Sequence, residues 1–284
     1  MIRVFVDSGS SIKQEEKEKY NVEILPLKIL LNDKEYLDGV DLTMDEFYHA
    51  LIEEKQFPKT SLPNMIEAKE RVMKYVNQGD DVIIIPISKA ISSTFSTLYM
   101  LFQDEEKVHV IDCKSVVGGI KLIVEEINRH RNQPIEIVLQ KIQDLLPKIR
   151  IVAIPDTLEY LYRGGRLSKV AYLAGNAMQL KPFIAIDNED GGVKMINKVL
   201  GRKKALKMLA NFLVTEDCDI SYPIIPSYTY DETNLDELIS LTDDKYKSAM
   251  IEYDNLDPAI ACHWGPGAFG YIFVSKQPYK KWFI

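Results

Sequence analysis

Short apolar runs rich in Val and Ile, each followed by a turn and then by a helical pattern, recur through the first half of the chain. Such runs are typical of strands buried on both faces, and strands that alternate with helices favour a parallel sheet. The runs lie at residues 2–6, 82–87 and 108–111. We therefore expect an α/β layer structure here, with a doubly wound and mostly parallel sheet.

The second half has a different order of elements, in which strands come in hairpins with helices beside them. Turn residues at 187–192 separate two apolar stretches and predict a hairpin. We further expect strands at 222–225, 250–253 and 269–274 and helices at 202–213 and 235–241. This pattern favours an α+β domain. A length of 284 residues predicts two domains, which we place at 1–150 and 151–284.

Local signals place several turns and helix starts. Thr43 and Glu46 form a capping box before an apolar run, and Asn64 is a candidate cap for the helix that follows Pro63. Asn32 and Asp33 predict a turn between two apolar stretches.

Composition excludes some function classes. The chain has 35 Lys and Arg against 42 Asp and Glu, and this net charge of −7 opposes binding to nucleic acid. Its three cysteines form no CxxC pair, which suits a reducing compartment, and its four histidines have no metal-binding spacing. No stretch approaches the roughly 18 apolar residues of a membrane span. We expect a cytoplasmic protein with no integral membrane segment, metal or cofactor.

Hydroxyl side chains gather where the predicted strands end. Because the carboxyl ends of parallel strands share one edge of a sheet, these hydroxyls can meet there and bind an anion together with helix N-termini. Alternatively, each one caps a helix or forms a turn. The hydroxyls are those of Ser8, Ser10, Ser11, Ser88, Ser92, Ser93, Ser96 and Ser115, with Thr60 and Ser61 in a separate loop.

The second half adds a histidine and two basic segments. His263 precedes Gly265-Pro266-Gly267 and can hold a ligand oxygen or transfer a proton, or it can simply precede a turn. Arg163 and Arg166 flank a glycine pair, where they can bind helix carbonyls or a carboxylate. The basic segment 202–207 is either a solvated helix face or a docking surface for an acidic partner. No nucleotide-binding loop or nucleophile elbow occurs.

Taken together, these motifs resemble the DegV-like proteins, the fatty-acid-binding subunits of bacterial fatty acid kinases. The block at 157–168, with Leu158-Glu159-Tyr160-Leu161 and Arg163-Gly164-Gly165-Arg166, is the most specific. The other matching blocks follow in family order at 7–10, 60–64, 91–96, 112–119, 180–182, 201–205 and 263–270. The sequence departs from the family pattern at Leu62, Asn64, Thr97 and Trp264.

The resemblance implies one long-chain fatty acid, such as palmitate, stearate or oleate, held between an α/β and an α+β domain. It implies that Thr60 and Ser92, with Ser61 and Ser93 adjacent, bind the carboxylate. It also implies that His263 and Arg163 or Arg166 lie near the head group. A partner subunit would bind ATP and phosphorylate the carboxyl group.

The expected function is therefore a lipid carrier with no catalytic residue of its own, recognised through Arg202, Lys203 and Lys204. One alternative is a stand-alone phosphotransferase or hydrolase that uses His263, with the Ser and Thr loops as an anion hole. Another is a pure interaction module with no bound ligand.

Overall fold

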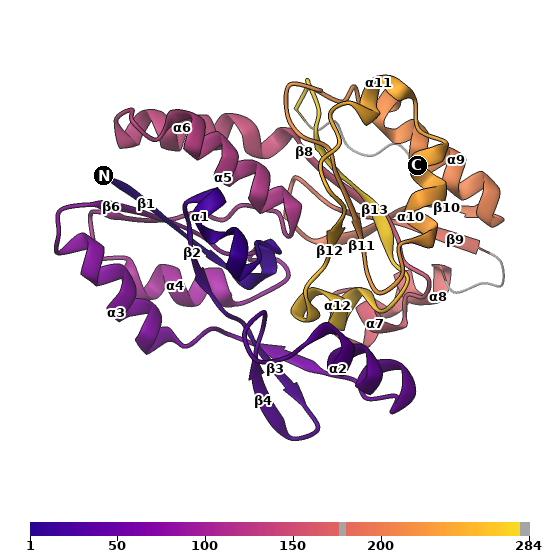
Figure 1. Ribbon diagram of the computed structural model, residues 1–284, viewed down its shortest axis with the longest axis horizontal. Helices are drawn as coiled ribbons and strands as arrows, with labels where there is room; N and C mark the ends of the chain where they lie inside the picture. The colour runs from indigo at the N-terminus through magenta and orange to yellow at the C-terminus, as the bar shows by residue number, and fades with distance from the viewer. Residues whose placement is uncertain (176–179, 279–284) are drawn as a thin grey trace. The chain divides into compact units, whose positions relative to one another are not determined.

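The computed structural model describes residues 1–175 and 180–278 of the chain (Figure 1). The chain divides into two compact units. The first contains Met1–Leu146 and three later residues, Asp257–Ala259, and the second contains Pro147–Leu256 and the chain from Ile260 onward. Within the described ranges, none of the helices has both the length and the apolar character required to cross a bilayer.

The first unit is built on a parallel sheet of four strands in the order β2-β1-β6-β7. Phe5 pairs with Ile84 in the central pair, and both side chains are fully buried. The strands are β1 (Ile2–Asp7), β2 (Glu23–Leu25), β6 (Asp81–Ile85) and β7 (Val108–Val110). All three strand pairs in this sheet are parallel, which confirms the predicted parallel sheet. Strands with β-branched side chains on both faces need cover on both sides, and helices on the two faces of a parallel sheet provide it.

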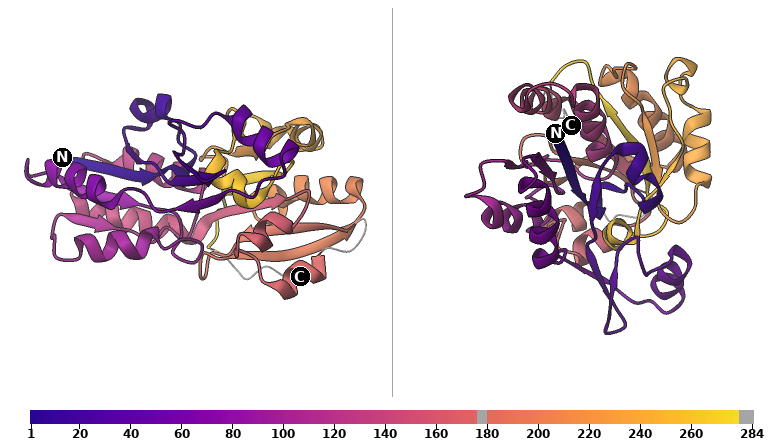
Figure 2. Two further views of the ribbon diagram at one scale, coloured as in Figure 1. Left: turned by 90° about the horizontal axis from the view of Figure 1, so that it is seen from below. Right: turned by 60° about the vertical axis from the view of Figure 1, so that its left-hand side comes forward.

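Helices α3 and α4 cover one side of this sheet, and α5 and α6 run along the other side (Figures 1 and 2). Ala68 and Val72 of α3 and Leu98 and Phe102 of α4 pack into one buried cluster with Phe5. The helices of this unit are α1 (Lys17–Tyr20), α2 (Met44–Tyr48), α3 (Met65–Val76), α4 (Thr94–Phe102), α5 (Gly118–His130) and α6 (Ile135–Leu145), with short 3₁₀ turns at Ser8–Ser10 (η1) and Gln14–Glu16 and a π turn at His49–Glu53. A further 3₁₀ turn, Leu146–Lys148, spans the boundary with the second unit.

A small antiparallel sheet in the order β4-β3-β5 completes this unit. Its strands are β3 (Lys28–Leu31), β4 (Lys34–Leu37) and β5 (Lys59–Ser61). Asn32 and Asp33 both have positive φ, 52° and 58°, as a type I′ hairpin turn requires. The predicted turn and the predicted Thr43–Glu46 capping box are both confirmed.

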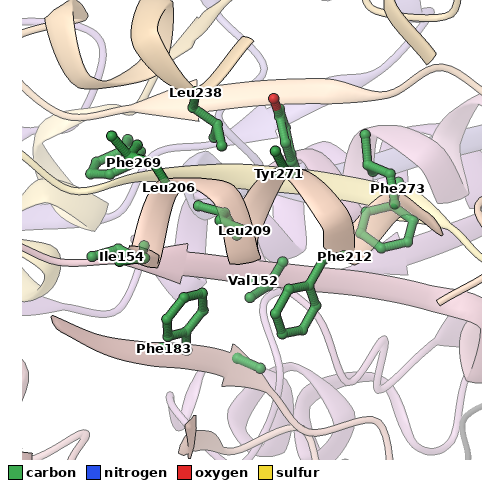
Figure 3. Packing of buried hydrophobic residues seen from close by; sticks show 14 of the residues in the cluster. Val152, Ile154, Phe183, Leu206, Leu209, Phe212, Leu238, Phe269, Tyr271 and Phe273 are labelled. Atoms are coloured by element: carbon green, nitrogen blue, oxygen red, sulfur yellow. The ribbon is translucent and has the colours of Figure 1, made fainter. Parts of the chain in front are cut away.

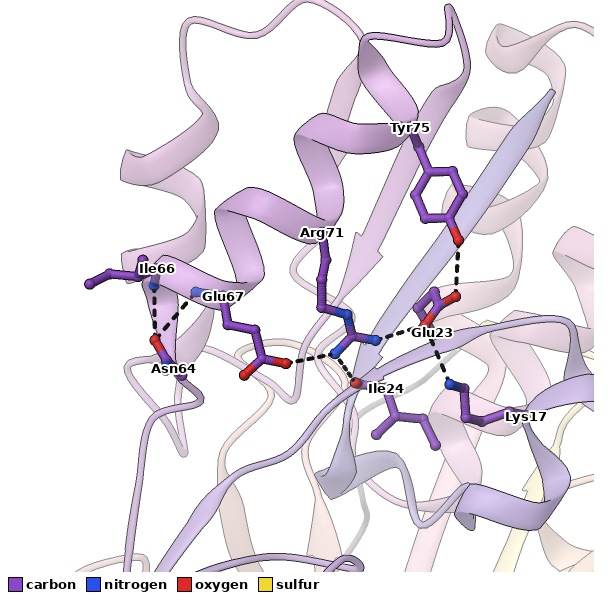
Figure 4. Close-up of polar contacts among 8 residues, drawn as sticks. All are labelled: Lys17, Glu23, Ile24, Asn64, Ile66, Glu67, Arg71 and Tyr75. Carbon is purple, nitrogen blue, oxygen red and sulfur yellow. Dashed lines mark hydrogen bonds and ion pairs between the residues drawn. The ribbon is translucent and has the colours of Figure 1, made fainter.

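Polar contacts fix helix α3 at its start and in its middle (Figure 4). The Asn64 side chain accepts hydrogen bonds from the backbone N–H groups of Ile66 and Glu67, so it is the predicted cap. One turn further on, Arg71 donates to the Ile24 carbonyl at 2.9 Å and to Glu23 at 2.7 Å, which ties the helix to β2.

The second unit is built on a six-stranded mixed sheet in the order β10-β9-β8-β13-β11-β12. Its strands are β8 (Ile149–Ile154), β9 (Leu180–Ile186), β10 (Val193–Leu200), β11 (Ile225–Tyr228), β12 (Asp254–Asn255) and β13 (Phe269–Val274). Strands β9 and β10 form the predicted antiparallel hairpin. The expected fold class, an α/β domain followed by an α+β domain, is confirmed.

One face of this sheet packs against α9, as Figure 3 shows. Leu206, Leu209 and Phe212 of α9 lie over Val152 and Phe183, and the rings of Phe183 and Phe212 stack with centroids 5.7 Å apart. The helices are α7 (Glu159–Arg163), α8 (Lys169–Gly175), α9 (Arg202–Thr215), α10 (Thr233–Ser240), α11 (Asp244–Lys247) and α12 (Pro258–Trp264), of which α12 begins in the three residues that belong to the first unit.

Two strand predictions in this unit are wrong in position. The strand expected at 222–225 is β11, which begins at Ile225 and continues through Pro226. The strand expected at 250–253 is reduced to a single bridge between Met250 and Ile224, and regular pairing resumes at Asp254 in β12. Proline has no N–H to donate, and the pairing with this neighbouring segment is interrupted opposite Pro226.

Candidate functional site

Ser92 lies in a tight loop that connects β6 to α4. The carbonyl of Ser88 accepts the N–H groups of Ile91 and Ser92, both at 3.1 Å. The Ser92 hydroxyl accepts the Thr94 N–H at 3.2 Å and lies 2.8 Å from the Thr94 hydroxyl. When Thr94 donates in that pair, the Ser92 proton is available for an anion. Ser92 is half-buried and Ser93 is exposed.

Thr60 lies on β5, directly opposite Ile29 of β3. It is half-buried, whereas its neighbour Ser61 is exposed. The backbone after Ser61 passes through buried Pro63 to Asn64, the cap of α3. Sheet pairing on one side and the helix cap on the other therefore fix the course of this loop.

Other serines at the same sheet edge hold the backbone in place. The Ser8 hydroxyl accepts the Leu27 N–H at 3.0 Å, and the Ser10 hydroxyl accepts the Ile12 N–H at 3.2 Å. The Ser88 hydroxyl accepts the Ala90 N–H at 3.3 Å. These hydroxyls stabilise turns, so the hydroxyl-rich edge contains both structural serines and serines that can meet a ligand.

Buried carboxyl groups lie near this edge, and no sequence pattern predicted that they are buried. Asp38 accepts the Ala259 N–H at 3.0 Å, and Asp257 forms an ion pair with Lys13. Burial, followed by the nearby charge of Asp257, raises the pKa of Asp38 to about 7. Asp7, at the end of β1, is 1% exposed, and burial raises its pKa to about 7 as well. The sequence feature that could have predicted such buried carboxyl groups is an acidic residue directly after an apolar run.

In the second unit, His263 lies in the last turn of α12 and packs against the glycine pair of the Arg163–Arg166 segment. A Cβ atom on Gly164 would lie 2.3 Å from the Nδ1 atom of His263. On the other side of the same contact, a Cβ atom on Gly265 would lie 2.2 Å from the ring of Tyr160. Only glycine at 164 and 265 allows these two segments to approach so closely.

The imidazole of His263 is neutral at pH 7. Burial lowers its pKa to about 4, and the positive charge of Arg166 contributes to that shift. A neutral imidazole can donate or accept a hydrogen bond at a carboxyl group without adding a buried charge.

The two arginines of this segment differ in their surroundings. Arg166 is half-buried, donates to the Gly164 carbonyl and acts on His263, and burial lowers its own pKa. Arg163 is exposed and forms an ion pair with Glu159 at 2.6 Å, one helical turn away. The structure therefore places Arg166 beside His263 and leaves Arg163 on an exposed helix face.

The basic segment begins α9, where Lys203 and Lys204 are exposed. Arg202 is also exposed but is already bound to α10, because its guanidinium lies 2.8 Å from Asn234 Oδ1 and pairs with Glu237. It also borders a small cavity of about 100 Å³ whose rim includes Lys181. Arg202 thus has a structural contact that the two lysines following it do not show.

The chain matches the family model described as "Uncharacterised protein, DegV family" over residues 1–276. The chain belongs to the DegV family. A DegV domain-containing protein of Clostridium acetobutylicum is 30% identical over 284 residues, which cover 97% of this DegV chain and 99% of that relative.

Solved DegV structures have the same fold. A protein from Eubacterium ventriosum, described as a fatty acid (stearic acid)-binding protein, is 25% identical, with a TM-score of 0.84 over 97% of this chain and 99% of its own. A DegV family protein from Thermus thermophilus, described by its fatty acid binding, is 25% identical, with a TM-score of 0.82 over 96% and 99% of the two chains.

Proposed function

We propose that this DegV protein binds one long-chain fatty acid, such as palmitate, stearate or oleate. The observation that carries the proposal is its likeness along nearly the whole chain to the stearic acid-binding protein from Eubacterium ventriosum. We further propose that it presents the carboxyl group to the ATP-binding subunit of a fatty acid kinase and has no catalytic residue of its own.

Thr60 and Ser92 are the proposed main ligands of the carboxylate. Both are half-buried hydroxyls on loops whose backbone is fixed by strand pairing or a helix start, and Ser61 and Ser93 are exposed beside them. Neutral donors suit this task, because they bind an anion without requiring a second charge to lose its hydration.

His263, Arg166 and Arg163 are the proposed contacts from the second unit. The neutral imidazole of His263 and the adjacent Arg166 support a polar, weakly charged contact with the head group. The charge that acts on His263 is that of an arginine, whereas a catalytic histidine is usually oriented by a carboxylate. This favours a binding role over the phosphotransferase or hydrolase alternative.

The acyl chain would supply most of the affinity. At about 0.8 kcal/mol per buried CH₂, roughly 14 methylenes contribute on the order of 11 kcal/mol before the cost of ordering the chain. The hydroxyls therefore set the orientation of the ligand, as a carrier requires.

Extraction of the purified protein, followed by gas chromatography and native mass spectrometry, tests the proposal. We expect one fatty acid per chain, and a delipidated sample should take up stearate again. A protein that neither retains lipid after mild purification nor binds added stearate would contradict the proposal. Turnover of an acyl ester that is lost in His263→Ala would support the hydrolase alternative.

Thr60→Ala and Ser92→Ala should each weaken stearate binding about ten- to hundredfold, because a hydrogen bond to a charged group contributes roughly 1.5–3 kcal/mol. Titration of delipidated protein measures this loss. Ser96→Ala, at an exposed position in the first turn of α4, is the matched control and should bind normally. Because Ser92 also accepts the Thr94 N–H, the melting temperature of each variant must be compared. Normal affinity in both variants would disprove the assignment.

The docking proposal rests on Arg202, Lys203 and Lys204. We expect Lys203→Glu combined with Lys204→Glu to leave lipid content unchanged and to slow acyl-phosphate formation with the kinase, most strongly at low salt. These two lysines are preferred for charge reversal, since replacing Arg202 would also break its contacts with Asn234 and Glu237. A wild-type phosphorylation rate at every salt concentration would show that this helix is only a solvated face.

A further inference from the structure

Ile87, the second residue after β6, is held by the carboxyl group that ends the neighbouring strand β1. Asp7 Oδ2 accepts the Ile87 N–H at 3.0 Å, and Asp7 is fully buried. Gly9 packs tightly against both residues of this hydrogen bond. A Cβ atom at Gly9 would lie 2.4 Å from the Ile87 side chain and 3.0 Å from Asp7 Oδ1. Asp7 therefore fixes the point at which the chain leaves the sheet.

The loop that carries Ser92 continues directly from this point. The N–H of Ser88 donates to the Ser115 carbonyl at 2.9 Å, so the backbone at 87–88 is bound on both sides. The Ser88 carbonyl then accepts the Ser92 N–H at 3.1 Å. A short series of hydrogen bonds thus leads from the Asp7 carboxyl group to the backbone of Ser92.

We propose that Asp7 is a positioning residue for the Ser92 hydroxyl, and that ionisation of Asp7 loosens the 88–93 loop and weakens ligand binding. This inference rests on the proposed binding of a fatty acid carboxylate by Ser92. The pH dependence of ligand binding then comes from Asp7, which does not itself contact the ligand.

The surroundings of Asp7 favour its neutral form. Burial favours the neutral carboxyl group and outweighs the backbone hydrogen bonds from Ile87 and Gly9, which favour the ionised form. The thiol of Cys113, which donates to the Pro86 carbonyl at 3.0 Å, faces Asp7 and is itself neutral because burial raises its pKa. Asp112 also acts on that thiol and forms an ion pair with Lys89 at 3.3 Å.

The sign of the effect follows from these surroundings. Burial raises the pKa of Asp7 from 3.8 to about 7, so the folded chain binds a proton that the unfolded chain has released. The stability contributed by neutral Asp7 is complete below pH 4 and is lost as the pH rises through 7. Above pH 7, the buried charge favours states in which the 88–93 loop is loosened and Asp7 is hydrated.

Four variants test the proposal with stearate as the probe between pH 6 and 8.5. Asp7→Ala removes the acceptor, and Asp7→Asn keeps an oxygen for the Ile87 N–H but cannot ionise. Asp80→Asn is the matched control, because Asp80 binds the N-terminal amine and Arg3 at the opposite end of β1. Asp38→Asn tests whether the pH dependence comes instead from Asp38, a second carboxyl group whose pKa lies near 7.

We expect Asp7→Ala to bind stearate about tenfold more weakly or worse, and Asp80→Asn to bind like the wild type. Wild-type affinity should fall about tenfold between pH 6 and 8.5, and the affinity of Asp7→Asn should be nearly independent of pH. Normal affinity of Asp7→Ala, or an unchanged pH profile in Asp7→Asn, would overturn the proposal. So would a profile flattened only by Asp38→Asn.

Hydrogen exchange without ligand keeps this test separate from the question of fatty acid binding. In Asp7→Ala the amides of Ser88 and Ser92 should exchange at least about tenfold faster, whereas Asp80→Asn should leave them unchanged. If the wild type bound no stearate but this difference appeared, the proposed function would fail and the positioning role of Asp7 would stand. Equal exchange in both variants would refute the positioning role.

Discussion

Replacing Arg150 with methionine should lower the free energy of unfolding by about 3–5 kcal/mol, because several acceptors around the buried guanidinium lose their donor at about 1–3 kcal/mol each. Arg150 is 2% exposed within β8. Its guanidinium pairs with Glu216 at 3.3 Å and donates to the carbonyls of Pro147 at 2.9 Å and Gln277 at 3.2 Å. Methionine can fill the volume but leaves these acceptors without a donor.

Urea unfolding followed by circular dichroism measures this loss. Lys276→Met is the matched control, because Lys276 pairs with Asp217 at 2.9 Å and both side chains are more than half exposed. An exposed pair contributes at most about 1 kcal/mol. If Arg150→Met and Lys276→Met cost the same, the buried network does not stabilise the second unit.

Gly164→Ala should reduce stearate affinity about ten- to hundredfold and lower stability by about 1–3 kcal/mol through overpacking. The φ angle of Gly164 is −70°, which alanine adopts readily, so the backbone tolerates the change. The new Cβ atom, however, would lie 2.3 Å from His263 Nδ1 and must displace the imidazole. The NMR titration of His263 should then move from a pKa of about 4 toward the ordinary value of 6.5.

Gly165→Ala serves as the control, because it should lower stability without changing stearate affinity. Its φ angle is +74° and no atom lies within 4 Å of the position of a new Cβ, so alanine strains the backbone by roughly 1–2 kcal/mol without touching His263. We expect a lower melting temperature and normal stearate affinity. Loss of affinity in Gly165→Ala but not in Gly164→Ala would contradict the role given to this contact.

The order of elements in the first unit could be predicted because each signal is local. Runs such as 82–87 contain enough β-branched residues to favour a buried strand, and Thr43 and Asn64 bind N–H groups only two or three residues away. Such interactions depend on spacing along the chain, which the sequence shows directly.

Strand β11 and Arg150 could not be placed in this way. Pro226 normally ends a strand, and only the interrupted pairing opposite it makes the position acceptable. Arg150 follows one strand residue and precedes four apolar ones, where alternation predicts an exposed side chain, yet its partners lie up to 127 residues away. Both outcomes depend on segments that are distant in the sequence.

The candidate site was predictable as a set of loops but not serine by serine. Ser8 and Ser10 stabilise turns, whereas Ser92 combines a local contact with partial exposure. All three follow apolar runs and look alike in the sequence. Asp38 was missed because its partner is the N–H of Ala259, which is 221 residues away.

The three residues Asp257–Ala259 also affect how the chain is made. Synthesis proceeds from the N-terminus, so the first unit emerges from the ribosome long before the residues that complete it. Until then Lys13 has no Asp257 to neutralise it, and Asp38 has no Ala259 N–H to accept. A gene fragment that ends at residue 146 would encode a first unit that permanently lacks Asp257–Ala259. The complete first unit therefore cannot be transferred between proteins as one continuous segment.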